Sequence, residues 1–242
     1  MDEHRENVIS KQPVSVQLGA DNLPEGLTEL ANLNTLHVQQ RLDVVEVILG
    51  WERNNRYRIT KSEDEQVLYA FEASDCGARQ CLGSLRAFTI KVCDNSQQEI
   101  MTLHRPLRCS SRCFWWCCNL QIMEIHSPPG TPVASVREIW SCYLPLYEVL
   151  GVDGSVMYSL HGGCCHCRCC CNVVFHVLGS KVGDSEVATI TKHWGGCKEL
   201  IGAVNNYTVE YTEQLDVVNK MIILGATFLI DFNYFEKHGR CC

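Results

Sequence analysis

The sequence predicts a mostly-β protein, a barrel or sandwich of about a dozen short strands followed by one hydrophobic helix. Short segments of alternating apolar and polar residues recur along most of the chain, and Gly, Pro, Asp and Asn separate them, which is typical of antiparallel strands. An apolar segment of helical length follows near the C-terminus. Hydrophobic residues make up 46% of the 242 residues and charged residues 20%, a composition suited to a packed core.

The first 34 residues are expected to form a flexible polar arm. Pro13, Pro24 and Gly26 interrupt this segment, and one short helix is expected at 24–31. Residues 1–8 are charged and contain no apolar run, so no secretory signal peptide is predicted. The bulk of the chain is therefore expected on the cytosolic side of any membrane it meets.

The expected strands follow in pairs, and a polar turn joins most of them. The strands are expected at 36–40 and 44–49, 56–60 and 66–71, 87–93 and 99–105, 120–126 and 131–139, 146–150 and 155–160, and 172–178 and 185–192. Pro128, Pro129 and Gly130 form one of the turns. Asp153 and Gly154 form another, and this dipeptide suits the positive φ angles of a tight hairpin.

The expected helix spans residues 217–235, and its central apolar run spans 221–230. Its apolar residues are Met221, Ile222, Ile223, Leu224, Phe228, Leu229 and Ile230. Lys220 and Asp231 flank that run, and a charge at the centre of a span costs roughly 2.5–3.5 kcal/mol. A span also needs about 20 apolar residues. These features favour a buried or interfacial helix and leave a membrane span as the alternative.

Four sequence motifs, in this order along the chain, resemble those of the phospholipid scramblase family. These are GWERNNRY at 50–57, LHRPLRCSS at 103–111 before a cysteine cluster, TKHW at 191–194, and GATFLIDF at 225–232. The resemblance covers residues 36–236. It implies a Tubby-like antiparallel barrel of about twelve strands around the hydrophobic helix, with 35–236 as one domain and 237–242 as a short tail.

The 17 cysteines are mostly clustered, and without an export signal they are expected to be reduced rather than paired in a disulfide framework. The first cluster is Cys109, Cys113, Cys117 and Cys118, beside aromatic residues that prefer the membrane boundary. The resemblance implies palmitoylation of this cluster, and stable anchoring takes at least two acyl chains. The alternative is a hydrophobic loop with buried thiols.

Two other motifs resemble a zinc site and a nuclear import signal, and neither is expected to have that function. Cys164, Cys167 and Cys170 have the CxxC spacing of zinc sites, but no second pair follows at a suitable distance, so zinc is disfavoured. The segment around Lys192 and Trp194 resembles a nuclear import signal of some relatives. It lacks clustered basic residues, so Trp194 is expected to pack in the core.

The resemblance also implies activation by calcium, through an acidic loop that precedes the helix. The matching segment is 204–216, where Asn205 and Asn206 stand at positions expected to be acidic and Glu210, Glu213 and Asp216 remain. Calcium takes six to eight oxygen ligands, so only a weak site is predicted.

An alternative interpretation of this segment needs no ion. Tyr207, Val209 and Tyr211 alternate with polar residues, which is typical of a half-buried strand. Asp216 is in turn suited to cap the terminal helix.

Two functions from different classes follow from the sequence. The resemblance implies a phospholipid scramblase at the plasma membrane, which moves membrane phospholipids between leaflets without ATP and with calcium stimulation. One short helix cannot enclose a polar path, so homo-oligomers are expected. The alternative is an acyl-anchored interaction module without scrambling activity. No catalytic motif is found, and the net charge of −7 makes nucleic acid an unexpected partner.

Overall fold

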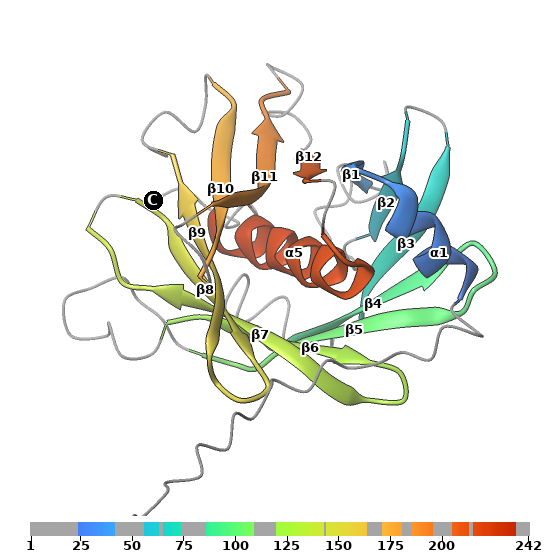
Figure 1. Cartoon of the computed structure of the whole chain (residues 1–242), viewed down its shortest axis with the longest axis horizontal. Coiled ribbons are helices and arrows are strands. Elements are labelled where there is room, and N and C mark those ends of the chain that lie inside the picture. The colour runs from blue at the N-terminus through green and yellow to red at the C-terminus, as the bar shows by residue number, and fades with distance from the viewer. Residues whose placement is uncertain are drawn as a thin grey trace, which may run out of the picture.

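The computed structural model describes residues 24–41, 56–62, 65–73, 86–108, 120–142, 144–163, 171–180, 185–195, 205–212 and 215–235. These residues form a closed antiparallel barrel of twelve strands with a C-terminal helix inside it (Figure 1). The mostly-β barrel predicted around a terminal helix is therefore confirmed.

Each strand pairs with its neighbours along the chain, and β1 closes the barrel against β12. The strands are β1 (Thr35–Arg41), β2 (Arg56–Thr60), β3 (Gln66–Ala73), β4 (Phe88–Asp94), β5 (Glu99–Arg105), β6 (Ile122–Ser127), β7 (Thr131–Ile139), β8 (Leu146–Gly151), β9 (Val156–Gly162), β10 (Val173–Gly179), β11 (Glu186–His193) and β12 (Asn206–Tyr211).

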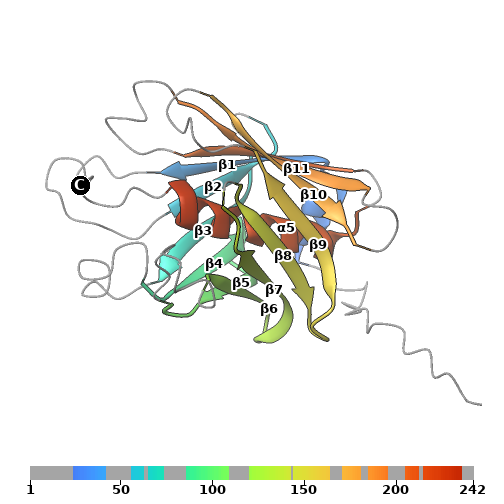
Figure 2. The same cartoon turned by 90° about the vertical axis from the view of Figure 1, so that its left-hand side faces the viewer.

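The antiparallel pairing gives the barrel two distinct ends. Odd-numbered strands finish at the end where Trp140 follows β7, which we call the Trp140 end. Even-numbered strands finish at the end where Val152 follows β8, which we call the Val152 end. In the side view of Figure 2, β1 runs toward the Trp140 end on the left.

The alternation predicted from the sequence places one face of each strand in the core. Along β1, burial alternates from residue to residue, with Leu36 and Val38 almost fully buried. Along β12, Tyr207, Val209 and Tyr211 point inward in the same way. Apolar side chains at every second position thus supply the inner wall that surrounds the helix.

The predicted tight turns are present at the Val152 end. Gly154 has a φ of 78° and Gly130 a φ of 108°, angles that other residues rarely adopt. Asp153 accepts a hydrogen bond of 3.0 Å from the backbone N–H of Ser155. The hairpins β6–β7 and β8–β9 therefore close where the sequence indicated.

The helix α1 (Glu25–Asn32) packs on the barrel beside β3 and β4. Leu27 and Leu30 are buried, and Gly26 approaches so closely that a Cβ there would lie 2.6 Å from Cβ of Asp94. Residues 24–34 of the predicted arm thus belong to the packed domain. The rest of that arm and the predicted tail, 237–242, lie outside the described residues.

The terminal helix is α5 (Val217–Ile230), continued by the π-helical turn η4 (Asp231–Phe235). Together they cover the range predicted for the helix, 217–235. The helix starts near the Val152 end and runs through the barrel, so that η4 lies toward the Trp140 end (Figures 1 and 2).

The twelve strands of the barrel differ from the predicted dozen at one position. The expected strand at 44–49 lies outside the described residues. The strand that closes the barrel is instead β12, inside the segment matched to the calcium loop. The alternative interpretation of that segment, a half-buried strand, is therefore confirmed.

Candidate functional site

The central helix is the element to which most functional expectations refer, and it is enclosed by the barrel. The seven apolar residues predicted for it are at most 2% exposed: Met221, Ile222, Ile223, Leu224, Phe228, Leu229 and Ile230. Residues 217–235 are long and apolar enough to cross a membrane, yet 78% of the apolar window is buried inside the barrel. The arrangement agrees with the buried helix favoured by the sequence rather than with a span.

A glycine lets the helix approach the sheet closely. A Cβ on Gly225 would lie 2.8 Å from Cδ1 of Ile125 and 3.2 Å from Cδ2 of Leu103. Any larger side chain at this position would have to displace residues of β5 and β6. Gly225 thus sets the distance between α5 and the barrel wall.

The first turn of the helix is capped by a carboxylate. Oδ1 of Asp216 accepts a hydrogen bond of 2.8 Å from the backbone N–H of Asn219. The predicted capping role of Asp216 is therefore confirmed. Burial, together with the nearby Asp216 carboxylate, raises the pKa of Tyr158 to about 12, so this phenol stays protonated at physiological pH.

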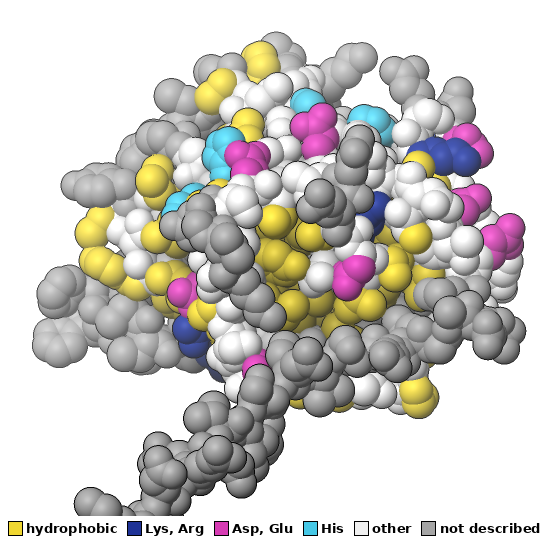
Figure 3. All heavy atoms as spheres, viewed as in Figure 1, with side chains coloured by type: hydrophobic (Ala, Val, Ile, Leu, Met, Phe, Trp, Pro, Cys, Tyr) yellow, Lys and Arg dark blue, Asp and Glu magenta, His cyan; other side chains and the backbone are white. Residues whose placement is uncertain are grey.

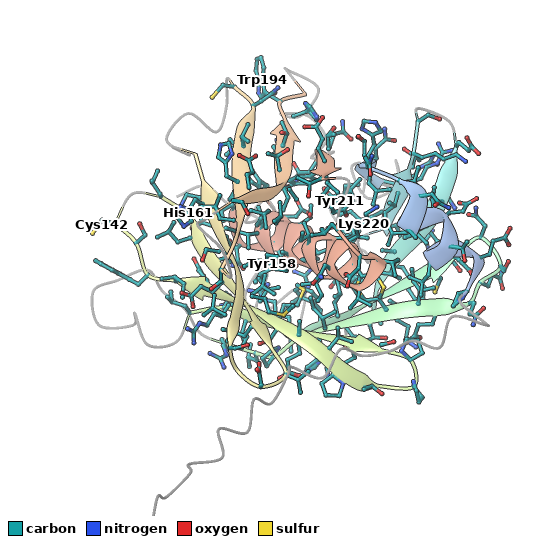
Figure 4. The ribbon with its side chains drawn as sticks, in the orientation of Figure 1. Cys142, Tyr158, His161, Trp194, Tyr211 and Lys220 are labelled. Carbon is teal, nitrogen blue, oxygen red and sulfur yellow. The ribbon has the colours of Figure 1, made fainter. Side chains whose placement is uncertain are left out.

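Lys220 holds the first helix of the domain against the last. Its ammonium group donates to the backbone carbonyls of Ala31 at 2.8 Å and Leu33 at 2.6 Å, and more weakly to Leu30 at 3.4 Å. It also lies 5.7 Å from the ring centre of Tyr211 (Figure 4). Burial lowers the pKa of Lys220. The residue therefore bonds inside the protein instead of extending toward a membrane surface.

Asp231 is the centre of a buried hydrogen-bond cluster. Its carboxylate accepts from the hydroxyl of Tyr57 at 2.6 Å, the hydroxyl of Tyr207 at 2.7 Å and the side-chain amide of Asn205 at 2.7 Å. Burial raises the pKa of Asp231, and the three hydrogen bonds and Lys192 oppose that rise. The cluster ties the end of the helix to β2 and β12.

Aromatic and ionic contacts complete this end of the helix. Phe232 stacks on Phe88 with ring centres 4.1 Å apart. Arg86 lies over Phe232 at 5.5 Å and forms two 2.8 Å hydrogen bonds with the carboxylate of Glu72. Arg86 and Glu72 are both buried, and their opposite charges offset the cost of removing each group from water.

The described residues of the predicted calcium site do not converge. The amide of Asn205 is bound to Asp231, Asp216 caps the helix, and Glu210 accepts a 3.2 Å hydrogen bond from Thr189 on the outer face of the sheet. The strand β12 separates Asn205 from Asp216, a distance of roughly 20 Å at 3.3 Å per residue. Asn206 begins that strand, and Glu213 lies outside the described residues.

The predicted modification and zinc sites cannot be placed in the same way. Cys109, Cys113, Cys117 and Cys118 lie outside the described residues, as do Cys164, Cys167 and Cys170. The cysteines that the structure describes are Cys93, which is buried in β4, and Cys142 and Cys171, which are exposed. Within the described part of the chain, no three His, Cys, Asp or Glu side chains are grouped as metal ligands.

The prediction that Trp194 packs in the core is wrong. Its side chain is 40% exposed, and its backbone N–H donates to the side chain of Asn172 at 2.9 Å. Trp194 follows the last residue of β11, so it lies beyond the end of the barrel wall. The inward position before it is taken by Lys192, which is buried beside Phe235 at 5.2 Å.

The Asp231 cluster was not predicted from the sequence. The local signal is a carboxylate at the edge of an otherwise apolar run, which indicates a cost of crossing a membrane but no hydrogen-bond partner. Its partners Tyr57 and Asn205 lie 174 and 26 residues away in sequence, so nothing near Asp231 identifies them.

Comparison with known proteins matches the Scramblase family model to residues 13–237. The chain belongs to the phospholipid scramblase family. It is 41% identical to mouse phospholipid scramblase 1 over 220 residues, which is 90% of this chain and 66% of the mouse protein. It is 40% identical to bovine phospholipid scramblase 2 over 216 residues, 89% of this chain and 73% of the bovine protein.

Human phospholipid scramblase family member 5 is also similar, with 35% identity over 219 residues, 89% of this chain and 79% of that protein. No solved structure matches the chain. The family match includes residues 13–23, which precede the described part of the chain. Membership of the scramblase family thus covers the whole barrel, α1 and the central helix.

Proposed function

We propose that this protein moves phospholipids between the two leaflets of a membrane, without ATP and with stimulation by calcium. The observation that carries the proposal is the family match across residues 13–237, together with relatives named phospholipid scramblases. The chain spans 66% of the mouse relative, so the activity of that longer protein enters here as a proposal. The proposed activity is transport, in which no covalent bond is made or broken.

The filled barrel constrains how lipids would move. The interior is occupied by α5, whose residues from Lys220 to Ile230 are all buried. A polar headgroup in hydrocarbon needs polar partners, because each unsatisfied polar group costs several kcal/mol. We therefore place the lipid path outside the barrel, where the protein thins the bilayer or where several copies meet. Homo-oligomers are part of this proposal.

Acylation of Cys109, Cys113, Cys117 and Cys118 would attach the barrel to the membrane, which we propose to be the plasma membrane. The family's membrane function and the enclosure of α5 both support this, since the helix is then not the anchor. Replacing Cys113, Cys117 and Cys118 by serine is expected to move the protein from the membrane to the soluble fraction of cells. Unchanged membrane retention, with loss of thioester-linked acyl groups, would contradict acyl anchoring.

The central experiment is transfer of fluorescent phospholipids in liposomes that contain the purified chain, with and without calcium. Calcium-dependent transfer is expected, and no transfer at millimolar calcium would contradict the proposal. The ion site is tested by Asp216→Asn combined with Glu213→Gln. Asparagine keeps the helix cap while removing the carboxylate charge, so a lower calcium response in this variant reports on ion binding alone.

A second candidate function is an acyl-anchored interaction module that does not itself scramble lipids. It is favoured by the separation of Asn205 from Asp216, because those residues leave no calcium site within the described part of the segment. Under this function the reconstituted chain moves no lipid with or without calcium. It would nevertheless remain on cell membranes through its acyl groups.

A further inference from the structure

The two ends of the barrel expose different side chains. Among the described residues, the exposed large hydrophobic side chains are Leu107 (56%), Trp140 (48%), Leu144 (42%), Val152 (65%) and Trp194 (40%). All of them except Val152 follow odd-numbered strands or precede even-numbered ones, and so lie at the Trp140 end. Tryptophan prefers the boundary between lipid headgroups and hydrocarbon.

The charges divide in the same way. Arg41 and Arg56 are exposed at the Trp140 end and form no side-chain hydrogen bond or ion pair with other described residues. Three acidic residues lie in the described parts of this end: Glu72, Glu138 and Asp231, and all three are buried. This count covers the described connections between strands, the two strand residues on either side of each connection, and η4. The charge accessible at this end, within the described residues, is therefore positive.

Arg41 and Arg56 are direct partners across the β1–β2 pair. Like charges in that position repel each other, so a bound anion would stabilise the pair. Arg41, Arg56 and Arg58 line a cavity of ≈ 680 Å³ together with Tyr69, Phe71 and the buried Glu72. A volume of that order accommodates a small ligand or headgroup, and guanidinium groups bind phosphate oxygens in pairs.

The accessible charge at the Val152 end is mainly negative. Its exposed acidic side chains, among the described residues, are Glu25, Glu65, Asp153, Glu186 and Asp216, of which Glu65 pairs with Lys61. On the face seen in Figure 3, where α1 and the start of α5 lie, acidic side chains are spread around a central apolar surface. The half-buried apolar side chains at this end, such as Met157 and Val187, pack against the core. An anionic membrane would be repelled from this end.

The cysteines lie at the same end of the barrel as the exposed apolar and basic side chains. Cys142 is exposed between Trp140 and Leu144, and Cys171 is exposed two residues before β10. Figure 4 shows Cys142 and Trp194 at the periphery of the ribbon, on different connections. Along the sequence, every cysteine except Cys93 falls between strands that meet at the Trp140 end or follows η4.

We propose that the Trp140 end is a docking surface for bilayers that contain anionic phospholipids. Trp140, Leu144, Leu107 and Trp194 enter the headgroup boundary, and Arg41 and Arg56 bind headgroup phosphates. This inference deepens the proposed function and rests on it for the presence of a membrane. It fixes the orientation of the barrel, with the acidic Val152 end in the aqueous phase.

The test uses the purified chain without acyl groups and flotation with vesicles of phosphatidylcholine, alone or mixed with phosphatidylserine. One variant combines Arg41→Gln with Arg56→Gln, and its control combines Lys61→Gln with Lys91→Gln, which removes the same charge elsewhere. A second variant combines Trp140→Ser with Leu144→Ser, and its control is Val152→Ser at the opposite end. Unchanged thermal unfolding shows that each variant is folded.

Binding is expected to require phosphatidylserine and to fall about 30-fold in the arginine variant, at about one kcal/mol for each basic residue near the surface. The Trp140/Leu144 variant is expected to lose binding to the vesicles that contain phosphatidylserine, while both controls bind like the unaltered chain. Equal binding by a variant and its control overturns the docking surface. So does complete competition by inorganic phosphate, which would make the arginine pair a site for a soluble anion.

Lipid transfer measured on the same proteins distinguishes a failure of the docking surface from a failure of the proposed lipid transport. Docking without transfer would leave the docking surface in place and remove the proposed function. Transfer that is equal in the docking variants and their controls, with equal binding, would leave the function in place and remove the docking surface.

Discussion

At the scale of single residues, the polar groups inside the barrel hold the central helix in position. Asp231 joins the end of the helix to β2 and β12 through Tyr57, Tyr207 and Asn205. Lys220 joins its start to α1 through backbone carbonyls. Because both charged residues are nearly fully buried, their partners are what make these positions tolerable. The two residues thus position the helix along its axis.

Replacing Asp231 by asparagine is expected to change how stability depends on pH. The raised pKa means that the folded protein holds a proton more tightly than the unfolded chain. The free energy of unfolding is then highest below about pH 4 for this group and falls as the pH rises through the raised pKa. Asp231→Asn should lack this part of the fall, as measured by urea unfolding across the same pH range.

The matched variant is Asp231→Ala, which leaves three buried donors without an acceptor. Its free energy of unfolding is expected to be lower by at least about 3 kcal/mol at neutral pH, and the loss in Asp231→Asn should be much smaller. Identical pH profiles for the unaltered protein and Asp231→Asn would contradict the raised pKa.

Residue burial was predictable where it follows the strand alternation and not where it depends on contacts between distant segments. Tyr207 and Val209 were assigned to one face of a strand from their spacing alone. Trp194 was expected in the core because its segment lacks the clustered basic residues of an import signal, but it stands one residue beyond β11 and is 40% exposed. The network of Asp231 depends on Tyr57, which only the closed barrel brings near.

At the scale of elements, the N-cap of α5 distinguishes a structural from an ion-binding role for Asp216. Asp216→Ala is expected to lower the free energy of unfolding by about 1 kcal/mol, because the N–H of Asn219 loses its acceptor. Asp216→Asn should restore most of that loss. Both effects should be the same with calcium and with a chelator, as measured by thermal unfolding. A loss seen only with calcium would identify Asp216 as a ligand instead.

The close approach of α5 to the sheet yields another prediction. Gly225→Leu is expected to lower the free energy of unfolding by about 2 kcal/mol or more, since the added atoms meet Ile125 and Leu103. Val217→Leu, at the half-buried start of the helix, serves as the control and should have little effect. Denaturant unfolding measures both. In a membrane span the same leucine would favour insertion, so an unchanged or higher stability would contradict the buried helix.

The elements themselves were largely predictable because their sequence signals are local. The alternation at 131–139 and the Asp153–Gly154 turn specify β7 and the β8–β9 hairpin without reference to the rest of the chain. The helix boundaries follow from Asp216 and the apolar run after it. The sequence favoured a buried helix over a membrane span but left the span as an alternative, because the composition of the helix suits both environments and only the closed barrel provides the apolar surroundings.

At the scale of the whole molecule, the interior of the barrel stabilises the fold, while one end of the barrel carries the side chains proposed to contact a membrane. The interior is used for stability, with α5 packed against the inward faces of the strands. Within the described residues, exposed aromatic side chains and unpaired arginines gather at the Trp140 end. Under the two proposals above, the protein acts on the bilayer from its surface and is attached by covalently added lipid and by side chains of the Trp140 end.

The enclosed helix predicts the membrane topology of the protein. Because α5 lies inside the barrel, residues 217–235 are expected not to cross the bilayer, and the two ends of the chain are expected on the same side. Epitope tags before Met1 and after Cys242 should both be stained by antibodies only after the plasma membrane of cells is permeabilised. Staining of the C-terminal tag on intact cells, with the N-terminal tag hidden, would show that the helix leaves the barrel and spans the membrane.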